Sequence, residues 1–152
     1  MIAVGSKAPD FTLSDHNGKQ VKLSELKGRK VLLSFHPLAW TSVCAEQMKS
    51  LEANFAEFEK LNTVAFGLSI DSVPCKKAWA KELAVVKTSL LCDFWPHGGV
   101  AKLYDIFREK DGFSERGNIV VDEGLRVTFA QTYPISQLPD IGEIIRFLRG
   151  KG

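Results

Sequence analysis

Three short apolar runs, each of strand length, occupy the first two thirds of the chain. They cover residues 30–35, 63–70 and 89–92, and each is too short for a buried helix. Pro37 ends the first run, because proline has no backbone N–H to continue a ladder. These runs predict buried strands.

The segments between these runs have apolar residues at helical spacing. Apolar residues at steps of three and four predict a helix that begins at Thr41 or Ser42 and continues to about Leu61. A second helix is expected to begin near Ser72 or Val73, with Pro74 in its first turn. Strand, helix, strand, helix in this order implies parallel strands joined by right-handed crossovers, and therefore an α/β fold. The apolar positions of the first helix are Met48, Leu51, Phe55, Phe58 and Leu61.

The remaining segments predict smaller elements on either side of this core. Alternating residues around a turn-rich loop indicate an N-terminal hairpin, and a glycine in the turn marks a second hairpin late in the chain. A last amphipathic helix is expected in the tail, with Ser136 as its cap and Pro139 in its first turn. In chain order the predicted elements are a hairpin of residues 11–14 and 21–23, a helical turn at 24–28, a helix over 100–107 with Leu103, Ile106 and Phe107 inward, a hairpin of 118–121 and 126–131, and the tail helix with Leu138, Ile141, Ile144, Ile145 and Leu148 on one face.

Composition narrows the class of protein. The 152 residues are 45% hydrophobic and 25% charged, which fits one globular domain covering residues 1–152. A formal charge of +2 with scattered basic residues gives no support for nucleic-acid binding. No apolar stretch approaches the length of a membrane span, and the N-terminus lacks the pattern of a signal peptide. We therefore expect a cytoplasmic protein that binds neither nucleic acid nor membrane.

The cysteines point to thiol chemistry. Cys44, Cys75 and Cys92 form no Cys-x-x-Cys pair and no zinc-binding spacing with histidine. An odd number of cysteines favours free thiols in a reducing compartment over a disulfide framework. Neither a metal nor an organic cofactor is expected. His36 precedes Pro37 and is interpreted as a residue with a role in packing or solvation, with tuning of a thiolate as the alternative.

Cys44 occupies the most informative position, because it falls in the first turn of the predicted helix. Free N–H groups and the positive end of the helix dipole favour a thiolate there, and the thiolate is the nucleophilic form. The hydroxyl of Thr41 is placed to donate to the sulfur or to hold an incoming oxygen. Pro37 keeps the loop rigid and shields the sulfur. From spacing alone, a buried cysteine acting as a small hydrophobe remains an equal alternative.

The spacing Pro37-x-x-x-Thr41-x-x-Cys44 resembles the active-site motif of the peroxiredoxins, the alkyl hydroperoxide reductase and thiol-specific antioxidant superfamily. Residues 8–11 resemble the opening of that family, and residues 69–72 with Trp79 resemble its next strand-to-helix segment. Residues 116–122 resemble its arginine-bearing strand. The resemblance spans nearly the whole chain. It implies a thioredoxin-like fold, in which a central mixed sheet is flanked by helices and preceded by an N-terminal β-hairpin.

The resemblance also implies an activity. Peroxiredoxins are antioxidant thiol peroxidases, so Cys44 would reduce hydrogen peroxide and small organic hydroperoxides and become a sulfenic acid. Arg116 would donate to the sulfur and to the peroxide, whereas without the resemblance a solvated arginine is favoured. A peroxide sensor that relays oxidation to a partner protein is the alternative function. A noncatalytic thioredoxin-like or chaperone module is disfavoured by the Pro37, Thr41, Cys44 and Arg116 set.

Departures from the family motif leave the mechanism open. Gln47 stands where many members carry the glutamate that holds the arginine, which leaves the anchor of Arg116 undefined. No cysteine follows Cys44 at five residues, so the sulfenic acid is resolved either by an external thiol, or by Cys75, or less favourably by Cys92 or an intermolecular disulfide. A thioredoxin- or glutaredoxin-like reductant and a homodimer are expected as partners. The apolar residues proposed for the dimer contact, which also fit a core role, are Trp40, Phe94, Trp95 and Pro96.

Overall fold

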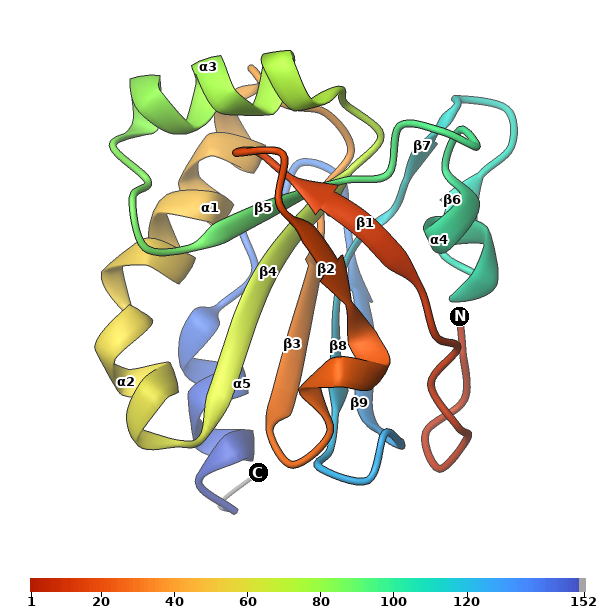
Figure 1. The fold of residues 1–152 in the computed structure, drawn as a ribbon, viewed down its shortest axis with the longest axis vertical. Helices are drawn as coiled ribbons and strands as arrows, with labels where there is room; N and C mark the ends of the chain where they lie inside the picture. The colour runs from red at the N-terminus through yellow and green to blue at the C-terminus, as the bar shows by residue number, and fades with distance from the viewer. Residues whose placement is uncertain (151–152) are drawn as a thin grey trace.

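A seven-stranded mixed sheet forms the centre of the computed structural model, which describes residues 1–150 (Figure 1). Its strands are β1 (Thr12–Asp15), β2 (Gln20–Lys22), β3 (Lys30–Phe35), β4 (Thr63–Ser69), β5 (Ser89–Cys92), β8 (Arg116–Val121) and β9 (Val127–Tyr133). They are ordered β2-β1-β5-β4-β3-β8-β9, and the neighbours β5, β4 and β3 are parallel. All the other neighbouring pairs are antiparallel. The expected mixed sheet with parallel crossovers is confirmed.

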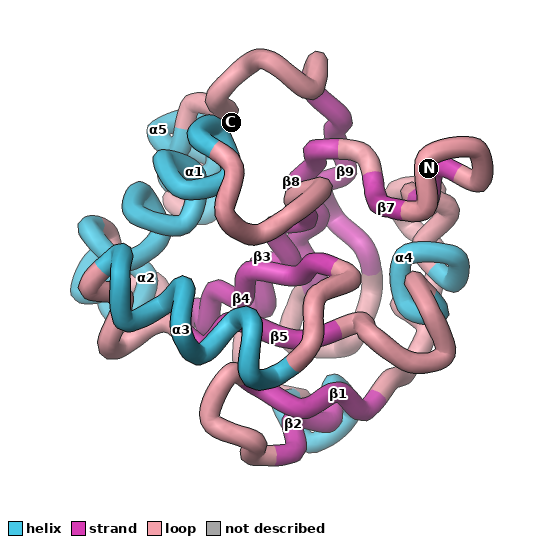
Figure 2. Tube along the Cα trace, turned by 90° about the horizontal axis from the view of Figure 1, so that it is seen from above, coloured by secondary structure: helices cyan, strands magenta, loops and turns pink. Residues whose placement is uncertain are grey.

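Helices cover both faces of the sheet. Figure 2 shows α1, α2, α3 and α5 on one side of the strands and α4 on the other. None of the helices within residues 1–150 is long and apolar enough to cross a membrane. The helices are α1 (Ser42–Ala53), α2 (Phe55–Lys60), α3 (Val73–Leu83), α4 (Gly99–Leu103) and α5 (Ile141–Leu148), and a 3-10 turn, η1, covers Leu23–Leu26.

Two apolar layers are packed against the two faces of the sheet. Successive residues of a strand point to opposite faces, so β3 contributes Val31, Leu33 and Phe35 to one layer and Leu32 to the other. The first layer includes Tyr104, which is fully buried. The second layer is formed with the helices and contains Cys44, Met48, Leu51, Phe58, Trp79, Ile144 and Leu148. The continuous apolar runs therefore reflect strands that are buried on both faces.

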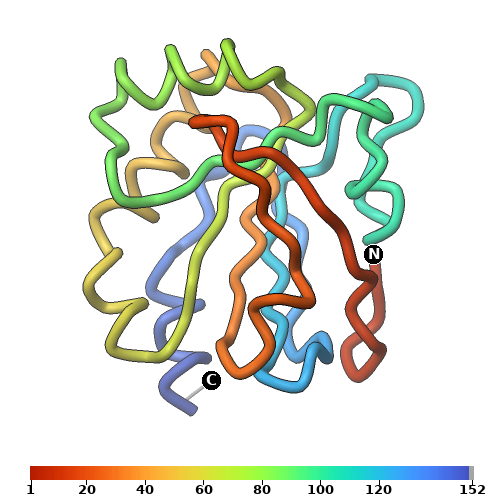
Figure 3. The backbone as a smooth tube through the Cα atoms, in the orientation of Figure 1, coloured from red at the N-terminus to blue at the C-terminus, as the bar shows by residue number. Residues whose placement is uncertain are grey.

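The N-terminal hairpin is confirmed and extends the sheet. In β1, Leu13 is paired with Val21 of β2, while Ser14 is paired with Cys92 of β5. Figure 3 traces this hairpin, in red and orange, to its place beside the green β5. Strand β1 is therefore hydrogen-bonded along the carboxyl-terminal half of β5.

The long helix predicted up to Leu61 is interrupted, so that prediction was wrong in its extent. α1 ends at Ala53, and Asn54 has φ −105° and ψ 14°. Its side-chain amide donates to the carbonyl of Ser50 at 2.8 Å, and such local side-chain bonds compete with the helical ladder. Phe58 of α2 is nevertheless buried in the same layer as Leu51, which is why the apolar pattern continues across the break.

The helix predicted over residues 100–107 is also shorter than expected. α4 ends at Leu103, Asp105 adopts a left-handed φ of 53°, and the N–H of Ile106 bonds back to the carbonyl of Ala101 at 2.9 Å. This is a helix-terminating backbone motif. Phe107 then begins a two-stranded hairpin that the sequence analysis missed, and Leu103 is 53% exposed instead of inward. The hairpin consists of β6 (Phe107–Arg108) and β7 (Phe113–Ser114).

The tail helix begins later than predicted. Its cap is Asp140, whose carboxylate accepts from the N–H of Gly142 at 2.9 Å, and Ser136 has no capping role. Pro139 disfavours helical backbone at Leu138, and Leu138 is exposed. The remaining apolar positions of the tail are packed in the second layer as expected, although Ile141 is only partly buried.

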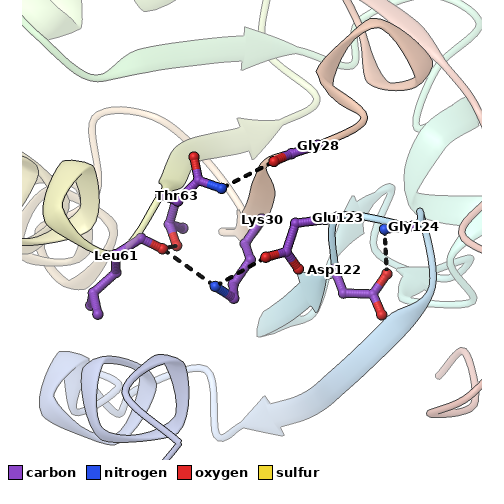
Figure 4. Close-up of polar contacts among 8 residues, drawn as sticks. Gly28, Lys30, Leu61, Thr63, Asp122, Glu123 and Gly124 are labelled. Carbon is purple, nitrogen blue, oxygen red and sulfur yellow. Dashed lines mark hydrogen bonds and ion pairs between the residues drawn. The ribbon is translucent and has the colours of Figure 1, made fainter.

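Polar contacts close the end of the sheet where β3 and β4 begin (Figure 4). The ammonium of Lys30 lies 3.5 Å from the carbonyl of Leu61 and 3.4 Å from the carboxylate of Glu123. The N–H of Gly124 donates to Asp122 at 2.9 Å in the β8–β9 turn. At the opposite end of the sheet, where β3, β4 and β5 finish, the chain leaves β3 and enters the loop that leads to α1.

A tight contact between β8 and its neighbours gives a stability prediction. A Cβ on Gly117 would lie 2.7 Å from Ile106 and 2.9 Å from the backbone carbonyl of Gln131, and a backbone atom in a paired strand cannot move aside. Gly117→Ala should therefore lower the free energy of unfolding by about 1–3 kcal/mol, as overpacking does, measured by urea denaturation. Gly99→Ala is the control, because its Cβ would meet nothing nearer than 3.8 Å. Equal stabilities of the two variants would contradict the prediction.

Candidate active site

Cys44 lies in the first turn of α1, at the edge of the sheet where β3 and β4 end. Strand β3 stops at Phe35, and the chain reaches α1 through a short loop that contains the buried Pro37. The Thr41 backbone is extended, with φ −115° and ψ 152°, so this residue is the N-cap of α1. Cys44 is fully buried with a free thiol. The predicted placement of the sulfur at a helix N-terminus agrees with the structure.

The hydroxyl of Thr41 does not make the expected contact with Cys44. Its proton is donated to the carbonyl of Leu38 at 2.7 Å, and it makes no capping bond to the helix. A hydroxyl has one proton but can accept two hydrogen bonds. In this arrangement Thr41 therefore presents acceptor sites, which suits the second role considered for it, that of holding an incoming oxygen.

Arg116 is the residue in closest polar contact with the sulfur. It is the first residue of β8, and the antiparallel pairing of Phe35 with Gly117 brings it next to the end of β3. Its Nη1 donates to Cys44 Sγ at 3.3 Å, and its Nε donates to the carbonyl of Ile135 at 2.9 Å. Only 2% of the residue is exposed. The interpretation of Arg116 as a solvated surface residue is therefore wrong.

Gln47 anchors the guanidinium. Its Oε1 accepts from Arg116 Nη1 at 2.8 Å, and its Nε2 donates to Ser34 Oγ at 2.8 Å and to the carbonyl of Phe35 at 3.1 Å. The hydroxyl of Ser34 in turn donates to Asn118 Oδ1 at 2.8 Å. These bonds fix which way the amide points, because its nitrogen is occupied by acceptors. The question raised by the missing glutamate is answered: a buried amide and a backbone carbonyl hold Arg116.

These anchors leave the charge of Arg116 uncompensated. No carboxylate in residues 1–150 lies within ion-pair distance of its guanidinium. The protein atoms to which it donates are the sulfur of Cys44 and neutral oxygens. A buried cation requires a compensating group, and an opposite charge nearby favours the ionised form of an acid. Of the protein atoms to which Arg116 donates, the sulfur of Cys44 is the one that can carry a negative charge.

A cavity of about 290 Å³ opens from the surface beside Arg116, whose guanidinium contacts the sulfur. Thr41 and Arg116 contribute polar atoms to its lining, and the fully buried Cys44 lies behind the wall next to Val43. Most of its wall is apolar, so the cavity can hold a small molecule with a polar group at its inner end. The other lining residues are Pro37, Leu38, Ser42, Val43, Phe113, Ile135 and Ser136.

His36 is fully buried behind the loop, in accordance with a packing role. Its ring lies 5.4 Å from the ring of Trp79, and Nε2 is 2.8 Å from the ammonium of Lys76. Burial and the charge of Lys76 lower the pKa of His36 well below its usual value, which keeps the imidazole neutral. The ring nitrogen Nε2 therefore accepts the hydrogen bond from Lys76.

The other two cysteines are free thiols outside the cavity. Cys75 is half-buried in α3, and its thiol donates to Asp71 Oδ1 at 3.8 Å. Burial and the neighbouring Asp71 carboxylate raise the pKa of Cys75. Burial raises the pKa of Cys92 to about 11, and its side chain is part of the core. Neither thiol is activated in this arrangement.

Sequence reasoning missed the polar residues that support the site. Ser34 interrupts the apolar run of β3, which was the available signal, whereas Asn118 follows Arg116 and Gly117 and gives no such signal. Lys76 lies three, four and seven positions before Trp79, Ala80 and Leu83, so helical spacing was the available signal for its burial. Within residues 1–150 no group of His, Cys, Asp and Glu is arranged to hold a metal ion.

Comparison with protein families gives one match that covers most of the chain. Residues 4–130 match the model of the AhpC/TSA family. Alkyl hydroperoxide reductase E of Mycobacterium tuberculosis is 41% identical over 132 residues, which are 86% of each chain. A peroxiredoxin of Thermoplasma volcanium is 32% identical over 97% of this chain and 74% of its own.

Solved structures share the fold. The reduced 2-Cys peroxiredoxin of Plasmodium vivax superimposes with a TM-score of 0.88 at 27% identity, covering 96% of this chain and 80% of its own. Peroxidoxin BcpB of M. tuberculosis gives a TM-score of 0.86 at 23% identity, with 99% and 98% covered, which supports the fold alone. The thioredoxin-like fold expected from the sequence is thus confirmed. The chain belongs to the AhpC/TSA family and is a peroxiredoxin, an oxidoreductase of the thiol-dependent peroxidase class.

Proposed function

We propose that Cys44 is the peroxidatic residue and that it reduces hydrogen peroxide and small organic hydroperoxides. The thiolate attacks one peroxide oxygen in line with the O–O bond. A sulfur–oxygen bond forms, the O–O bond breaks, and the second oxygen leaves with the electron pair as hydroxide or alkoxide, which takes up a proton. The sulfur ends as a sulfenic acid and the peroxide as water or an alcohol.

The contact between Arg116 and Cys44 is the observation that carries this proposal. Negative charge lies on sulfur before the reaction and develops on the departing oxygen during it. The guanidinium carries several N–H donors in one plane, so it can donate first to the sulfur and then to the departing oxygen. Because its protein anchors are neutral, its charge is available to the reacting atoms. Thr41, with free acceptor sites, is suited to orient the O–H of the peroxide.

The shape of the cavity supports organic hydroperoxides as well as hydrogen peroxide. The walls formed by Leu38, Val43, Phe113 and Ile135 are apolar, and an alkyl substituent would bury surface against them. Pro37 closes the wall next to the loop and leaves no unpaired N–H there. The cavity volume of about 290 Å³ fits a small substituent.

An external thiol is the proposed reductant of the sulfenic acid, supplied by a thioredoxin- or glutaredoxin-like protein. Its thiolate displaces the sulfenic oxygen as water and forms a mixed disulfide, which a second thiol then reduces. The raised pKa values of Cys75 and Cys92 support this choice over an internal disulfide. Cys75 is the second candidate, because it is packed against the layer that contains Cys44.

A homodimer is proposed for the assembled enzyme, with residues 1–152 of each copy forming one domain. Large apolar side chains are exposed, among them Trp40 at 55% on the loop before α1 and Trp95 at 80% after β5, and extended apolar surface on a monomer marks an interaction site. Burial of Trp40 in a dimer would cover the outer side of the active-site loop. Phe94, which is next to Trp95 after β5, is also exposed, and so is Leu103 on α4.

Replacement of the nucleophile tests the proposal directly. Cys44→Ser should reduce peroxide consumption, measured with excess dithiothreitol as the thiol, to the rate of the buffer, because a serine hydroxyl is not ionised at neutral pH. Cys92→Ser is the matched control and should keep wild-type turnover. Substantial peroxidase activity of Cys44→Ser would remove Cys44 from the mechanism.

A variant of Gln47 tests whether its amide holds the guanidinium of Arg116 in place. Gln47→Leu removes the acceptor of Arg116 and the donor to Ser34 while keeping a similar volume, so the guanidinium loses its fixed position. The second-order rate constant of Cys44 oxidation, followed by rapid-quench mass spectrometry, should fall about tenfold to a hundredfold. The exposed Gln131→Leu is the control. A wild-type rate constant for Gln47→Leu would show that the amide is dispensable.

The route of resolution is tested with stoichiometric peroxide. One equivalent of hydrogen peroxide should add one oxygen to the fully reduced protein, and a sulfenic-acid trap should locate it on Cys44. Cys75→Ser should give the same product and the same turnover with external thiol. Loss of two hydrogens, with a peptide linking Cys44 to Cys75, would instead identify Cys75 as the resolving residue and contradict the external route.

A further inference from the structure

Lys76 is a buried lysine on the side of the active-site loop opposite Arg116. It lies on α3, none of its surface is exposed, and it has no ion-pair partner within residues 1–150. Its neighbour Lys77 on the same helix is exposed. Burying an ammonium without a direct counter-ion is unfavourable for folding. A residue retained under that penalty is a candidate for a role in function.

The ammonium of Lys76 joins the end of β3 to the end of β4. It donates to His36 Nε2 at 2.8 Å and to Ser69 Oγ at 2.7 Å. It also lies 5.5 Å from the ring centre of Trp79, within the range of a cation–π contact. His36 is the residue immediately before Pro37, so the first bond fixes the point where the active-site loop leaves the sheet.

The second bond continues to the middle of the loop. Ser69 Oγ donates to Asp71 Oδ2 at 2.6 Å. This carboxylate oxygen of Asp71 also accepts a hydrogen bond from the backbone N–H of Ala39 at 2.9 Å. Ala39 precedes Trp40, whose left-handed φ of 67° turns the chain toward Thr41. Lys76 therefore holds the loop at two places, at its start through His36 and at its turn through Ser69 and Asp71.

The charges around Lys76 come from several elements. Burial lowers the pKa of Lys76 to about 8, against the opposing influence of Asp71 and of the three cysteines. The field of its ammonium thus reaches Cys44 and the other two cysteines. The titratable and charged groups that face Lys76 or its imidazole partner are His36 at the end of β3, Cys44 on α1, Asp71 after β4, Cys75 on α3, Cys92 on β5 and Arg116 on β8.

We propose that Lys76 is a positioning residue for the peroxidase reaction, which holds the loop of residues 37–41 against the sheet so that Thr41 and Cys44 face the substrate cavity. The inference rests on the proposed function of Cys44. Lys76 touches neither the sulfur nor the cavity, and it acts through His36, Ser69 and Asp71. Arg116 and Lys76 then act from opposite sides of one loop, the first on the reacting atoms and the second on the backbone that carries them.

The protonation state of Lys76 makes the role measurable. Below pH 8 the ammonium is present, and its hydrogen bonds are charge-assisted. Above that pH the neutral amine makes weaker bonds to His36 and Ser69 and holds the loop less firmly, so the rate of Cys44 oxidation should fall severalfold. Ionisation of Cys44 itself can only raise the rate as pH increases. Burial raises the pKa values of Cys92, Tyr104 and Tyr133, so these groups remain protonated in this range.

The experiment measures the rate constant of Cys44 oxidation by hydrogen peroxide between pH 6 and 10, by rapid-quench mass spectrometry. Lys76→Met should lower the rate constant about tenfold to a hundredfold and abolish the fall above pH 8. Lys77→Met is the matched control and should keep both the rate and the profile. Asp71→Ala removes the carboxylate that raises the pKa of Lys76, so it should slow the reaction and move the fall to lower pH.

These outcomes separate the inference from the peroxidase assignment. A wild-type enzyme that reacts but shows no fall up to pH 10 overturns the role of Lys76 and leaves Cys44 in place. A wild-type profile for Lys76→Met has the same meaning. No reaction of wild-type protein with peroxide overturns the proposed function and this inference with it. If Lys76→Met fails to fold, as judged by near-ultraviolet circular dichroism, the wild-type profile and Asp71→Ala decide the matter.

Discussion

The buried guanidinium of Arg116 against the sulfur of Cys44 is the interaction on which the site depends. A cation without a carboxylate partner is unfavourable in a protein interior, and here the protein supplies only the sulfur and neutral oxygens at distances of 2.8–3.3 Å. The sulfur of Cys44 is therefore the one contact of the arginine that can carry a negative charge. In the proposed reaction, this one contact would both stabilise the nucleophile and compensate the buried charge.

The topology of the sheet brings these residues together from distant parts of the chain. Arg116 and Cys44 are 72 positions apart in sequence, yet β8 is paired directly with β3 and begins beside the point where β3 ends. The polar chain from Asn118 through Ser34 to Gln47 crosses the same strand pair and continues into α1. A shift in register between β8 and β3 would thus displace the arginine, its anchor and the helix together. The strand pairing is as much a part of the site as the side chains.

Most elements and the position of Cys44 in the first turn of a helix could be predicted from sequence because their signals are local. Apolar runs, proline positions and the spacing of Pro37, Thr41 and Cys44 all lie within short windows. Helix ends were less predictable, because Asn54 and Asp105 end helices through side-chain and left-handed backbone geometry that many sequences tolerate. The anchor of Arg116 and the hydrogen-bond partners of Lys76 depend on contacts between distant strands and helices, which no window contains.

Gln47 illustrates how a departure from a family motif is absorbed by its surroundings. A glutamate at this position would neutralise the guanidinium, whereas the amide holds it through one oxygen and needs acceptors for its own N–H groups. Ser34 and the carbonyl of Phe35 supply those acceptors, so the amide remains oriented. The arginine keeps its position while its full charge acts on the sulfur. With Lys76 buried behind the same loop, two cations without carboxylate partners flank the active-site turn. The carboxylate of Asp71 accepts the N–H of Ala39 and is linked to Lys76 through Ser69, so it offsets the charge on that side of the turn. On the other side Arg116 contacts the sulfur of Cys44, and no carboxylate intervenes.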